Sequence, residues 1–97
     1  MLNILIVDTD LRGRLDLAER LRASGHTAFP VGSIREAASA ATGHPIDLAL
    51  VELSVPDLDG FAVAQVVRQA RPEALLCACV RTTRKADMVA AMQAGFA

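Results

Sequence analysis

The stretch DLALVELSVPDLDG at residues 47–60 decides the fold. Its first part, Leu48 to Val51, is apolar at every position, which is typical of a parallel strand covered on both faces. Glu52 follows that run directly and precedes a loop rich in Pro, Asp and Gly. In an open parallel sheet, ligands and chemistry collect at the carboxyl ends of the strands. We therefore expect the Glu52 carboxylate at the edge of the sheet where a site would lie.

Two further apolar runs have the same character and also end at informative residues. Residues 2–8 close on Asp8, and residues 74–80 close on Val80 just before a basic loop. The carboxyl ends of adjacent parallel strands lie at one edge of a sheet. We therefore expect Asp8, Glu52 and the residues around Val80 to meet at a common rim.

Strand and helix signals alternate four times along the chain, with short links between them. Capping residues, glycines and prolines mark the predicted helix ends. This alternation predicts right-handed parallel crossovers, and hence an α/β doubly wound parallel sheet sandwiched by helices. One domain is expected over residues 1–97. The predicted strands are 2–8, 27–31, 48–51 and 74–80, and the predicted helices are 11–24, 33–42, 61–70 and 85–94.

Single residues refine this outline. Pro30 cannot donate a hydrogen bond to a ladder, so the strand at 27–31 is predicted at an edge of the sheet. Thr9 or Asp10 is predicted to cap the first helix, which ends at Gly25. The residues that this helix carries on one face are Leu11, Leu15, Ala18 and Leu21.

The composition excludes several classes of protein. The 97 residues are 53% hydrophobic and 22% charged, with a net charge of -1, which is typical of a compact soluble domain. This balance gives no electrostatic attraction to nucleic acid or anionic lipid, and no apolar run approaches the roughly 18 residues of a membrane span. We expect a cytoplasmic protein without direct nucleic-acid or membrane binding. Cys77 and Cys79 are interpreted as small buried hydrophobic residues, not as a disulfide or a zinc site.

Several acidic residues near the expected rim have structural roles open to them. Asp10 precedes a helix, and we interpret it as an N-cap before a ligand. Asp57 and Asp59 lie in a Pro/Gly loop, where aspartate bonds to its own backbone, and Asp59 can also cap the next helix. Asp8 and Glu52 instead follow apolar runs, where a carboxylate needs a cation, a donor or water. We favour a paired-acid site of Asp8 and Glu52, whose mutual repulsion a divalent metal would relieve.

Three segments in order carry a resemblance to a known family: ILIVD at residues 4–8, the stretch at 47–60, and AAMQAG at residues 90–95. With them the chain resembles the receiver domain of bacterial two-component response regulators, which has the CheY-like, flavodoxin-like fold. The resemblance implies the strand order 2-1-3-4, with the fifth β/α unit missing or truncated in this chain. It also implies a phosphorelay, in which a histidine kinase supplies a phosphoryl group to an aspartate after the third strand. An acidic pair after the first strand then holds Mg²⁺.

The family's phosphoacceptor and metal positions carry unusual residues in this chain. The resemblance places the phosphoacceptor at Glu52, whose carboxylate projects one methylene further than that of an aspartate. It places the acidic pair on Asp8 and Thr9, so that a neutral hydroxyl replaces the second acid, while Asp10 stands one residue late. The implied metal ligands are therefore Asp8, Glu52 and Ser54. Since Mg²⁺ demands near-octahedral oxygen ligands, we expect its binding to be weak or absent.

The positions that would read a bound phosphoryl group differ as well. The resemblance places the hydroxyl switch position at Val80, with Thr82 and Thr83 as substitutes after a shift of register. It places the family's lysine beyond Ala97. The loop residues that match the family pattern are Pro56, Asp59 and Gly60.

These residues predict a signalling domain rather than an enzyme. We expect an atypical receiver, in which Glu52 is a fixed negative charge weaker than a phosphoryl group. It would act through contacts with a histidine kinase, an effector domain or a second copy, using the last helix (85–94) and an exposed last strand. The alternative is a Mg²⁺-dependent phosphatase that resembles the haloacid dehalogenases, with Asp8 as nucleophile and Asp10 as general acid. Arg12 stands where that motif expects a hydroxyl residue or valine.

Overall fold

The computed structural model of the protein describes residues 1–54, 56–80 and 84–97. Strands and helices alternate along the chain as the sequence predicts. Four parallel strands form one sheet in the order β2-β1-β3-β4, which confirms the α/β class and the expected strand order. The elements are β1 (Asn3–Val7), α1 (Leu11–Ala23), β2 (Thr27–Val31), α2 (Ile34–Gly43), β3 (Leu48–Glu52), α3 (Gly60–Ala70), β4 (Leu75–Cys79) and α4 (Lys85–Gln93).

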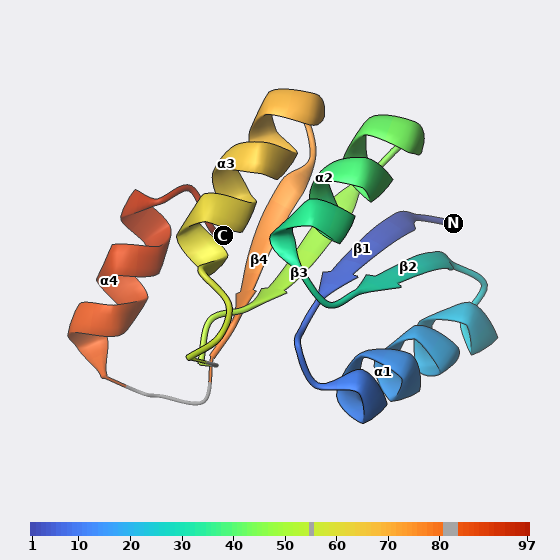
Figure 1. Ribbon diagram of the computed structural model, residues 1–97, viewed down its shortest axis with the longest axis horizontal. Helices are drawn as coiled ribbons and strands as arrows, with labels where there is room; N and C mark the ends of the chain where they lie inside the picture. The colour runs from blue at the N-terminus through green and yellow to red at the C-terminus, as the bar shows by residue number, and fades with distance from the viewer. Residues whose placement is uncertain (55, 81–83) are drawn as a thin grey trace.

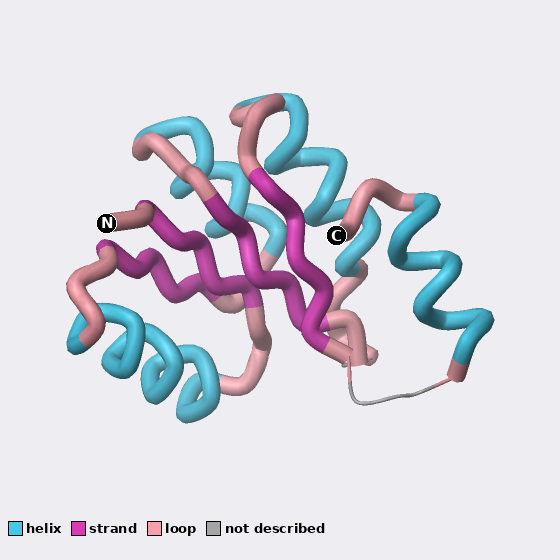
Figure 2. Tube along the Cα trace, turned by 180° about the vertical axis from the view of Figure 1, so that it is seen from behind, coloured by secondary structure: helices cyan, strands magenta, loops and turns pink. Residues whose placement is uncertain are grey.

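The helices cover the two faces of the sheet unequally. Figure 1 shows α2 and α3 over one face, with α4 beside α3 at the side of β4. Figure 2, seen from behind, shows α1 over β1 and β2 on the other face, while no helix of the described chain covers β4 there. Strand β2, which contains Pro30, is one edge of the sheet as predicted, and β4 is the other edge.

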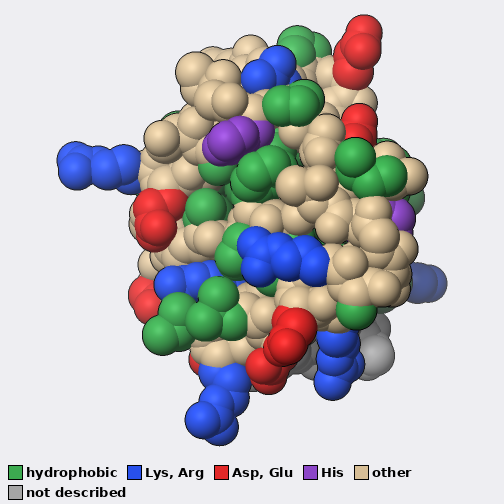
Figure 3. Space-filling model, turned by 90° about the vertical axis from the view of Figure 1, so that its right-hand side faces the viewer, with side chains coloured by type: hydrophobic (Ala, Val, Ile, Leu, Met, Phe, Trp, Pro, Cys, Tyr) green, Lys and Arg blue, Asp and Glu red, His purple; other side chains and the backbone are tan. Residues whose placement is uncertain are grey.

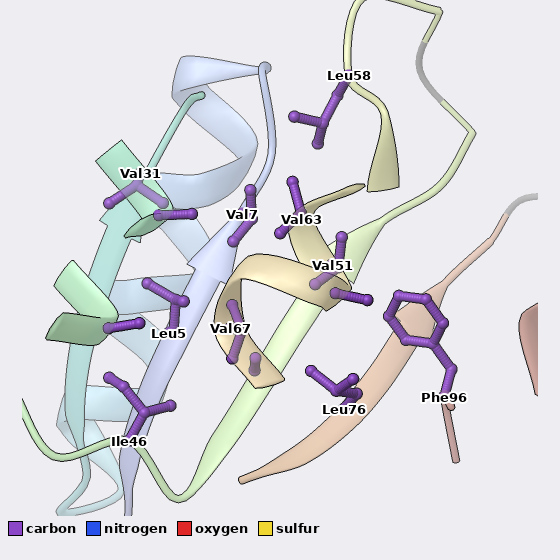
Figure 4. Close-up of a cluster of buried hydrophobic side chains, with 14 of the residues drawn as sticks. Leu5, Val7, Val31, Ile46, Val51, Leu58, Val63, Val67, Leu76 and Phe96 are labelled. Carbon is purple, nitrogen blue, oxygen red and sulfur yellow. The ribbon is translucent and has the colours of Figure 1, made fainter. Parts of the chain in front are cut away.

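The main core fills the space between the sheet and helices α2 and α3, and Phe96 closes it beside β4 (Figure 4). Its largest fully buried side chains are those of Leu5, Val7, Val51, Val63 and Val67. A smaller cluster under α1 consists of Ile4, Ile6, Ala18 and Ala28. Burying each large aliphatic side chain contributes about 1.5–3 kcal/mol. Strand β1 is covered on both faces, and Leu48 and Leu50 of β3 are partly buried on the α1 side. Both strands are therefore apolar at successive positions instead of alternating.

The apolar face predicted for α1 is confirmed at Ala18 and Leu21 and is wrong at Leu11 and Leu15. Leu11 and Leu15 are 57% and 47% exposed, whereas Ala18 is fully buried. Leu17 and Leu21 pack partly buried against the same cluster as Ala18. At 3.6 residues per turn, position 15 lies farther than position 17 from a stripe centred on Ala18 and Leu21. Leu11 lies close to that stripe but is the first residue of the helix. The choice between these two overlapping stripes was made by the fit of the helix to the sheet.

Three helices begin with an aspartate or serine cap, as their sequences predict. The side chains of Asp10, Ser33 and Asp59 accept hydrogen bonds from the backbone N–H three residues further on, which satisfies donors that a helix N-terminus leaves open. Asp10 is therefore the cap of α1, and Thr9 is not. Helix α4 follows Arg84, which makes no such side-chain bond.

Two arginines bind the carboxyl ends of neighbouring helices. Arg71 donates through Nε to the carbonyl oxygens of Ala41 at 2.8 Å and His44 at 3.0 Å, where α2 ends. Arg68 donates through Nη2 to the carbonyl oxygen of Ala94 at 2.6 Å, where α4 ends. A helix C-terminus presents unpaired carbonyls and a partial negative charge, so a guanidinium stabilises it.

The two cysteines are less buried than predicted. Cys77 and Cys79 are free thiols and are half-buried. They pair in register with Leu50 and Glu52 of β3, on the face of the sheet that α1 covers only over β1 and β2. The face is open at β4, and this explains the partial exposure.

The described surface shows no strong segregation of charge on the side that carries β2. Figure 3 shows basic and acidic side chains interspersed there with hydrophobic ones. Among the described helices, none combines the length and the apolar character that crossing a membrane would require.

Candidate functional site

The carboxyl ends of β1, β3 and β4 lie at the same end of the sheet (Figure 1). Val7 and Val51 are paired across β1 and β3, so Asp8 and Glu52 occupy neighbouring strand ends. Glu52 in turn pairs in register with Cys79 of β4. The sheet therefore brings Asp8, Glu52 and the end of β4 to one rim, as the three apolar runs indicate.

Glu52 is a buried acid with a backbone partner. It is 8% exposed, and its Oε1 accepts a hydrogen bond from the backbone N–H of Ser54 at 2.7 Å. The carboxylate is thus folded back toward the loop that follows its own strand. A charged acceptor with a short bond to an amide is among the stronger hydrogen bonds in proteins, so this contact orients both the side chain and the start of the loop.

The acids after β1 face the start of α1. Oδ1 of Asp8 accepts a hydrogen bond from the backbone N–H of Asp10 at 3.0 Å. Oδ2 of Asp10 accepts from the backbone N–H of Gly13 at 3.2 Å, as the N-cap of α1. The N-terminus of a helix carries a partial positive charge that stabilises carboxylates. Arg14 donates to the carbonyl oxygens of Asp8 and Thr9, at 3.1 and 3.3 Å, and not to a carboxylate.

Thr9 makes the contact that the sequence did not indicate. Its hydroxyl Oγ1 donates to Oδ1 of Asp57 at 3.0 Å, which joins the loop after β1 to the loop after β3. Asp57 was expected to bond to its own backbone. The two residues are 48 positions apart, and no local pattern could have paired them.

The loop after β3 also holds the residues that match the receiver pattern. Pro56 is exposed, and Asp59 accepts from the backbone N–H of Ala62 at 3.1 Å as the cap of α3. Gly60 is buried, and a Cβ built on it would collide with the side chain of Leu53. A residue with a Cβ would fit at this position only if the side chain of Leu53 moved away.

Cys79 is the other rim residue that sequence reasoning missed. Burial raises the pKa of its thiol, and the neighbouring Cys77, Glu52 and Asp8 raise it further in that order. The register Glu52↔Cys79 brings the thiol to the acids. The strand register could have been proposed from the apolar runs, but the sequence contains no signal that separates this cysteine from a core residue.

The switch position lies in an open cavity. Val80 is 38% exposed and lines a cavity of about 460 Å³ between the loop after β3 and helix α4. The other lining residues are Leu53, Ser54, Phe61, Arg84, Asp87 and Ala90. Thr82 and Thr83, the expected substitutes, lie outside the described residues. Val80, where the resemblance places the switch hydroxyl, brings methyl groups and no hydroxyl to this cavity.

The rim residues do not fit a tightly held divalent cation. Among residues 1–54, 56–80 and 84–97, no three His, Cys, Asp or Glu residues are grouped so that they could hold a metal ion. Thr9, where the resemblance places a second acid, has a neutral hydroxyl that donates to Asp57. Asp10 is turned to the backbone of α1. Since Mg²⁺ requires near-octahedral oxygen ligands, this set of donors is incomplete.

Comparisons of sequence identify the relatives of this chain. A sequence model of a family described as response regulator receiver domain matches residues 4–97. The chain is also similar to the probable transcriptional regulator ycf27 of Cyanidium caldarium, with 34% identity over 67 residues. That match covers 69% of this chain and 27% of the relative, so the chain spans only about a quarter of the relative's length.

Comparisons of structure show the same fold in several solved receiver proteins. The non-phosphorylated HemR receiver domain of Leptospira biflexa matches with a TM-score of 0.85 and 22% identity, over 100% of this chain and 78% of that one. The chemotaxis protein CheY4 of Vibrio cholerae matches with 0.89 and 19%, over 99% and 82%. A Burkholderia pseudomallei response regulator solved with a phosphorylated aspartic acid, calcium ion and citrate matches with 0.88 and 20%, over 99% and 56%.

Proposed function

The chain belongs to the response regulator receiver family, and we propose that it is a degenerate receiver that signals through protein contacts without regular aspartyl phosphorylation. Receiver domains are signalling modules of two-component systems, and they interact with kinases and effector domains. The proposal treats residues 1–97 as one such domain. A location in the cytoplasm is part of the same proposal.

The observation that carries the proposal is the state of Glu52. Phosphoryl transfer needs a nucleophile in line with the phosphorus and a cation to neutralise the developing charge. Glu52 is one methylene longer than aspartate, is buried and has its carboxylate turned onto the N–H of Ser54. Receiver domains commonly bind Mg²⁺ at this place, whereas the donors described around Asp8 and Glu52 favour weak binding or none.

Incubation with acetyl phosphate and Mg²⁺, followed by intact-mass measurement, tests the proposal. We expect no added phosphoryl group on the native chain. A gain of one phosphoryl group that is absent in the Glu52→Gln variant would refute it. The matched variant Glu52→Asp, alone and with Thr9→Asp, restores the family's acids. Only the double variant is expected to gain a phosphoryl group, because it supplies both nucleophile and metal ligands.

We further propose that α4 and the outer edge of β4 form the contact surface. The N–H of Leu53 donates to the carbonyl oxygen of Cys79 at 2.9 Å. In a strand, the backbone groups of alternate residues point to the same side, so those of every second residue of β4 are hydrogen-bonded to β3. The backbone groups of Leu76 and Ala78 therefore point to the outer edge. Ala97 donates to the carbonyl oxygen of Leu76 at 2.7 Å. Open strand edges and exposed apolar side chains favour association with another chain; those of α4 are Met88, Val89 and Met92.

Sedimentation over a range of concentrations tests this surface. If a second copy binds there, Met88→Lys with Met92→Lys should weaken association at least tenfold. The matched control is Leu11→Lys with Leu15→Lys, an equally exposed i, i+4 pair on α1, which should leave it unchanged. A monomer at all concentrations would exclude self-association and leave a kinase or effector domain as the partner.

The phosphatase alternative has no support from the comparisons. Asp10, its proposed general acid, is the N-cap of α1 and is bonded to Gly13. We expect the chain to hydrolyse an aryl phosphate with Mg²⁺ no faster than buffer alone does. Hydrolysis above that background that disappears in the Asp8→Asn variant would support the phosphatase alternative.

A further inference from the structure

The loops after β1 and β3 are joined at the rim by one side-chain hydrogen bond. Oγ1 of Thr9 donates to Oδ1 of Asp57 at 3.0 Å across 48 positions of sequence. Thr9 is half-buried and Asp57 is exposed. The bond therefore links the start of the α1 region to the loop that carries Pro56 and leads to the cap of α3.

We infer that the Thr9–Asp57 bond is a metal-independent latch: it holds the loop after β3 against the loop after β1, so the rim keeps its shape without a divalent cation. A cation shared by acids of two loops would hold them together through charge. Here a neutral hydroxyl and a carboxylate make the same connection directly. This inference stands whether or not Glu52 accepts a phosphoryl group.

The two other acids of the rim, Asp8 and Glu52, already accept hydrogen bonds from backbone N–H groups. They therefore need no metal ion to neutralise them, which is consistent with a metal-independent latch. Asp8 accepts from Asp10 N–H, and Glu52 accepts from Ser54 N–H. A Cβ built on Gly13 would lie 2.7 Å from Oδ2 of Asp10 and 3.6 Å from Oδ2 of Asp8, so both carboxylates lie close to the start of α1. The partial positive charge of that helix end offsets part of their repulsion. The repulsion that a metal would otherwise relieve is thereby reduced.

The latch acts on the surface next to α4. The loop it holds continues into Asp59 and Gly60 at the start of α3, and Phe61 follows. The ring of Phe61 packs edge-on against that of Phe96, with centroids 6.4 Å apart. Phe61 also lines the cavity at Val80. A loop held at Thr9 and Asp57 favours one arrangement of this cavity, with no ligand needed to set it.

Amide hydrogen exchange of the loop after β3, measured at Leu53, Ser54, Asp57 and Leu58, tests the latch. Thr9→Val keeps the shape of the side chain but removes the hydroxyl donor. We expect the amides of the loop to exchange about three- to tenfold faster in this variant, as the loss of one hydrogen bond implies. Thr9→Ser keeps the hydroxyl and should exchange within about twofold of the native chain. Asp57→Ala should match Thr9→Val, and the double variant should be no faster than either single variant, because both remove one interaction.

Magnesium separates the latch from a metal bridge. The native loop should exchange at the same rate in MgCl₂, at about 10 mM, and in NaCl of equal ionic strength, because its rim does not depend on a divalent cation. Thr9→Asp puts a third carboxylate beside Asp8 and Asp57, so its loop should exchange faster and be slowed by Mg²⁺. Protection of the native loop by Mg²⁺ beyond that by NaCl would overturn the inference. Equal exchange in the native chain and Thr9→Val, or additive effects in the double variant, would overturn it too.

Discussion

Glu52 of β3 and Cys79 of β4 are paired residues of neighbouring strands, so a buried carboxylate and a half-buried thiol lie side by side at the rim of the sheet. The pairing places a thiol, as a reporter group, next to Glu52. The pKa of Cys79 is raised by burial first, and then by Cys77, Glu52 and Asp8, so the ionisation of Cys79 responds to both the burial and the charges of the site.

The Cys79 thiol should ionise at a higher pH in the folded chain than in the unfolded one. Burial raises its pKa above the usual value of 9.0, and Cys77, Glu52 and Asp8 add to the rise. Alkylation rates, resolved between Cys77 and Cys79 by fragment masses, should show the Cys79 midpoint above that of the same chain in urea. Identical midpoints in the two states would contradict the structure.

The same shift has a consequence for stability with a defined sign. A thiol with a raised folded-state pKa binds its proton more tightly in the folded chain. Its contribution to stability is fully present below the unfolded pKa and is lost as the pH rises through the folded pKa. Stability of the native chain should therefore fall relative to Cys79→Ala on the alkaline side of pH 9, as urea unfolding would show.

Glu52→Gln should lower the pKa of Cys79 toward its ordinary value. The substitution removes the negative charge beside the thiol but keeps an oxygen that can accept from Ser54 N–H. Glu73→Gln makes the same change of charge at an exposed residue before the other end of β4, and it should leave the thiol unchanged. An equal effect of the two variants would mean that overall charge, and not the Glu52–Cys79 pairing, controls the thiol.

Three glycine-to-alanine variants should rank in a fixed order of stability. Gly95 has φ 101° and a built Cβ collides with the guanidinium of Arg68, which binds the end of α4, so Gly95→Ala should cost about 2–3 kcal/mol. Gly25 has φ 91° with open space and should cost about 1–2 kcal/mol. Gly43 has open space and no positive φ, and its change should be neutral or stabilise by about 0.5 kcal/mol. Urea unfolding measures all three.

Arg71→Met should destabilise the chain by about 1–3 kcal/mol, because it removes the donor that serves the carbonyls of Ala41, Thr42 and His44 at the end of α2. Methionine retains much of the apolar stem. The control Arg20→Met changes an exposed arginine of α1 and should stay within about 0.5 kcal/mol. A similar loss in both variants would assign the effect to charge instead of the helix end.

The strand order, the helix boundaries and the meeting of Asp8 with Glu52 at one rim could all be predicted from the sequence. The helix boundaries and the shared rim follow from local signals, which are apolar runs without alternation, capping residues and an acid at the end of a run. The strand order was instead implied by the resemblance to the receiver family, with Pro30 placing its strand at an edge. The exposure of Leu11 and Leu15 could not be predicted. Two apolar stripes overlap on α1, and only packing against Ile4 and Ile6 selects between them.

The sequence by itself therefore determined the α/β architecture and the place of Glu52 at the end of the third strand, because periodicity and capping act within a few residues. Only the tertiary structure decided what the rim side chains bond to. Thr9 meets Asp57 across 48 positions, and Cys79 meets Glu52 through the register of two strands. Such contacts depend on the relative placement of whole elements, which the packing of the core sets and no local pattern records.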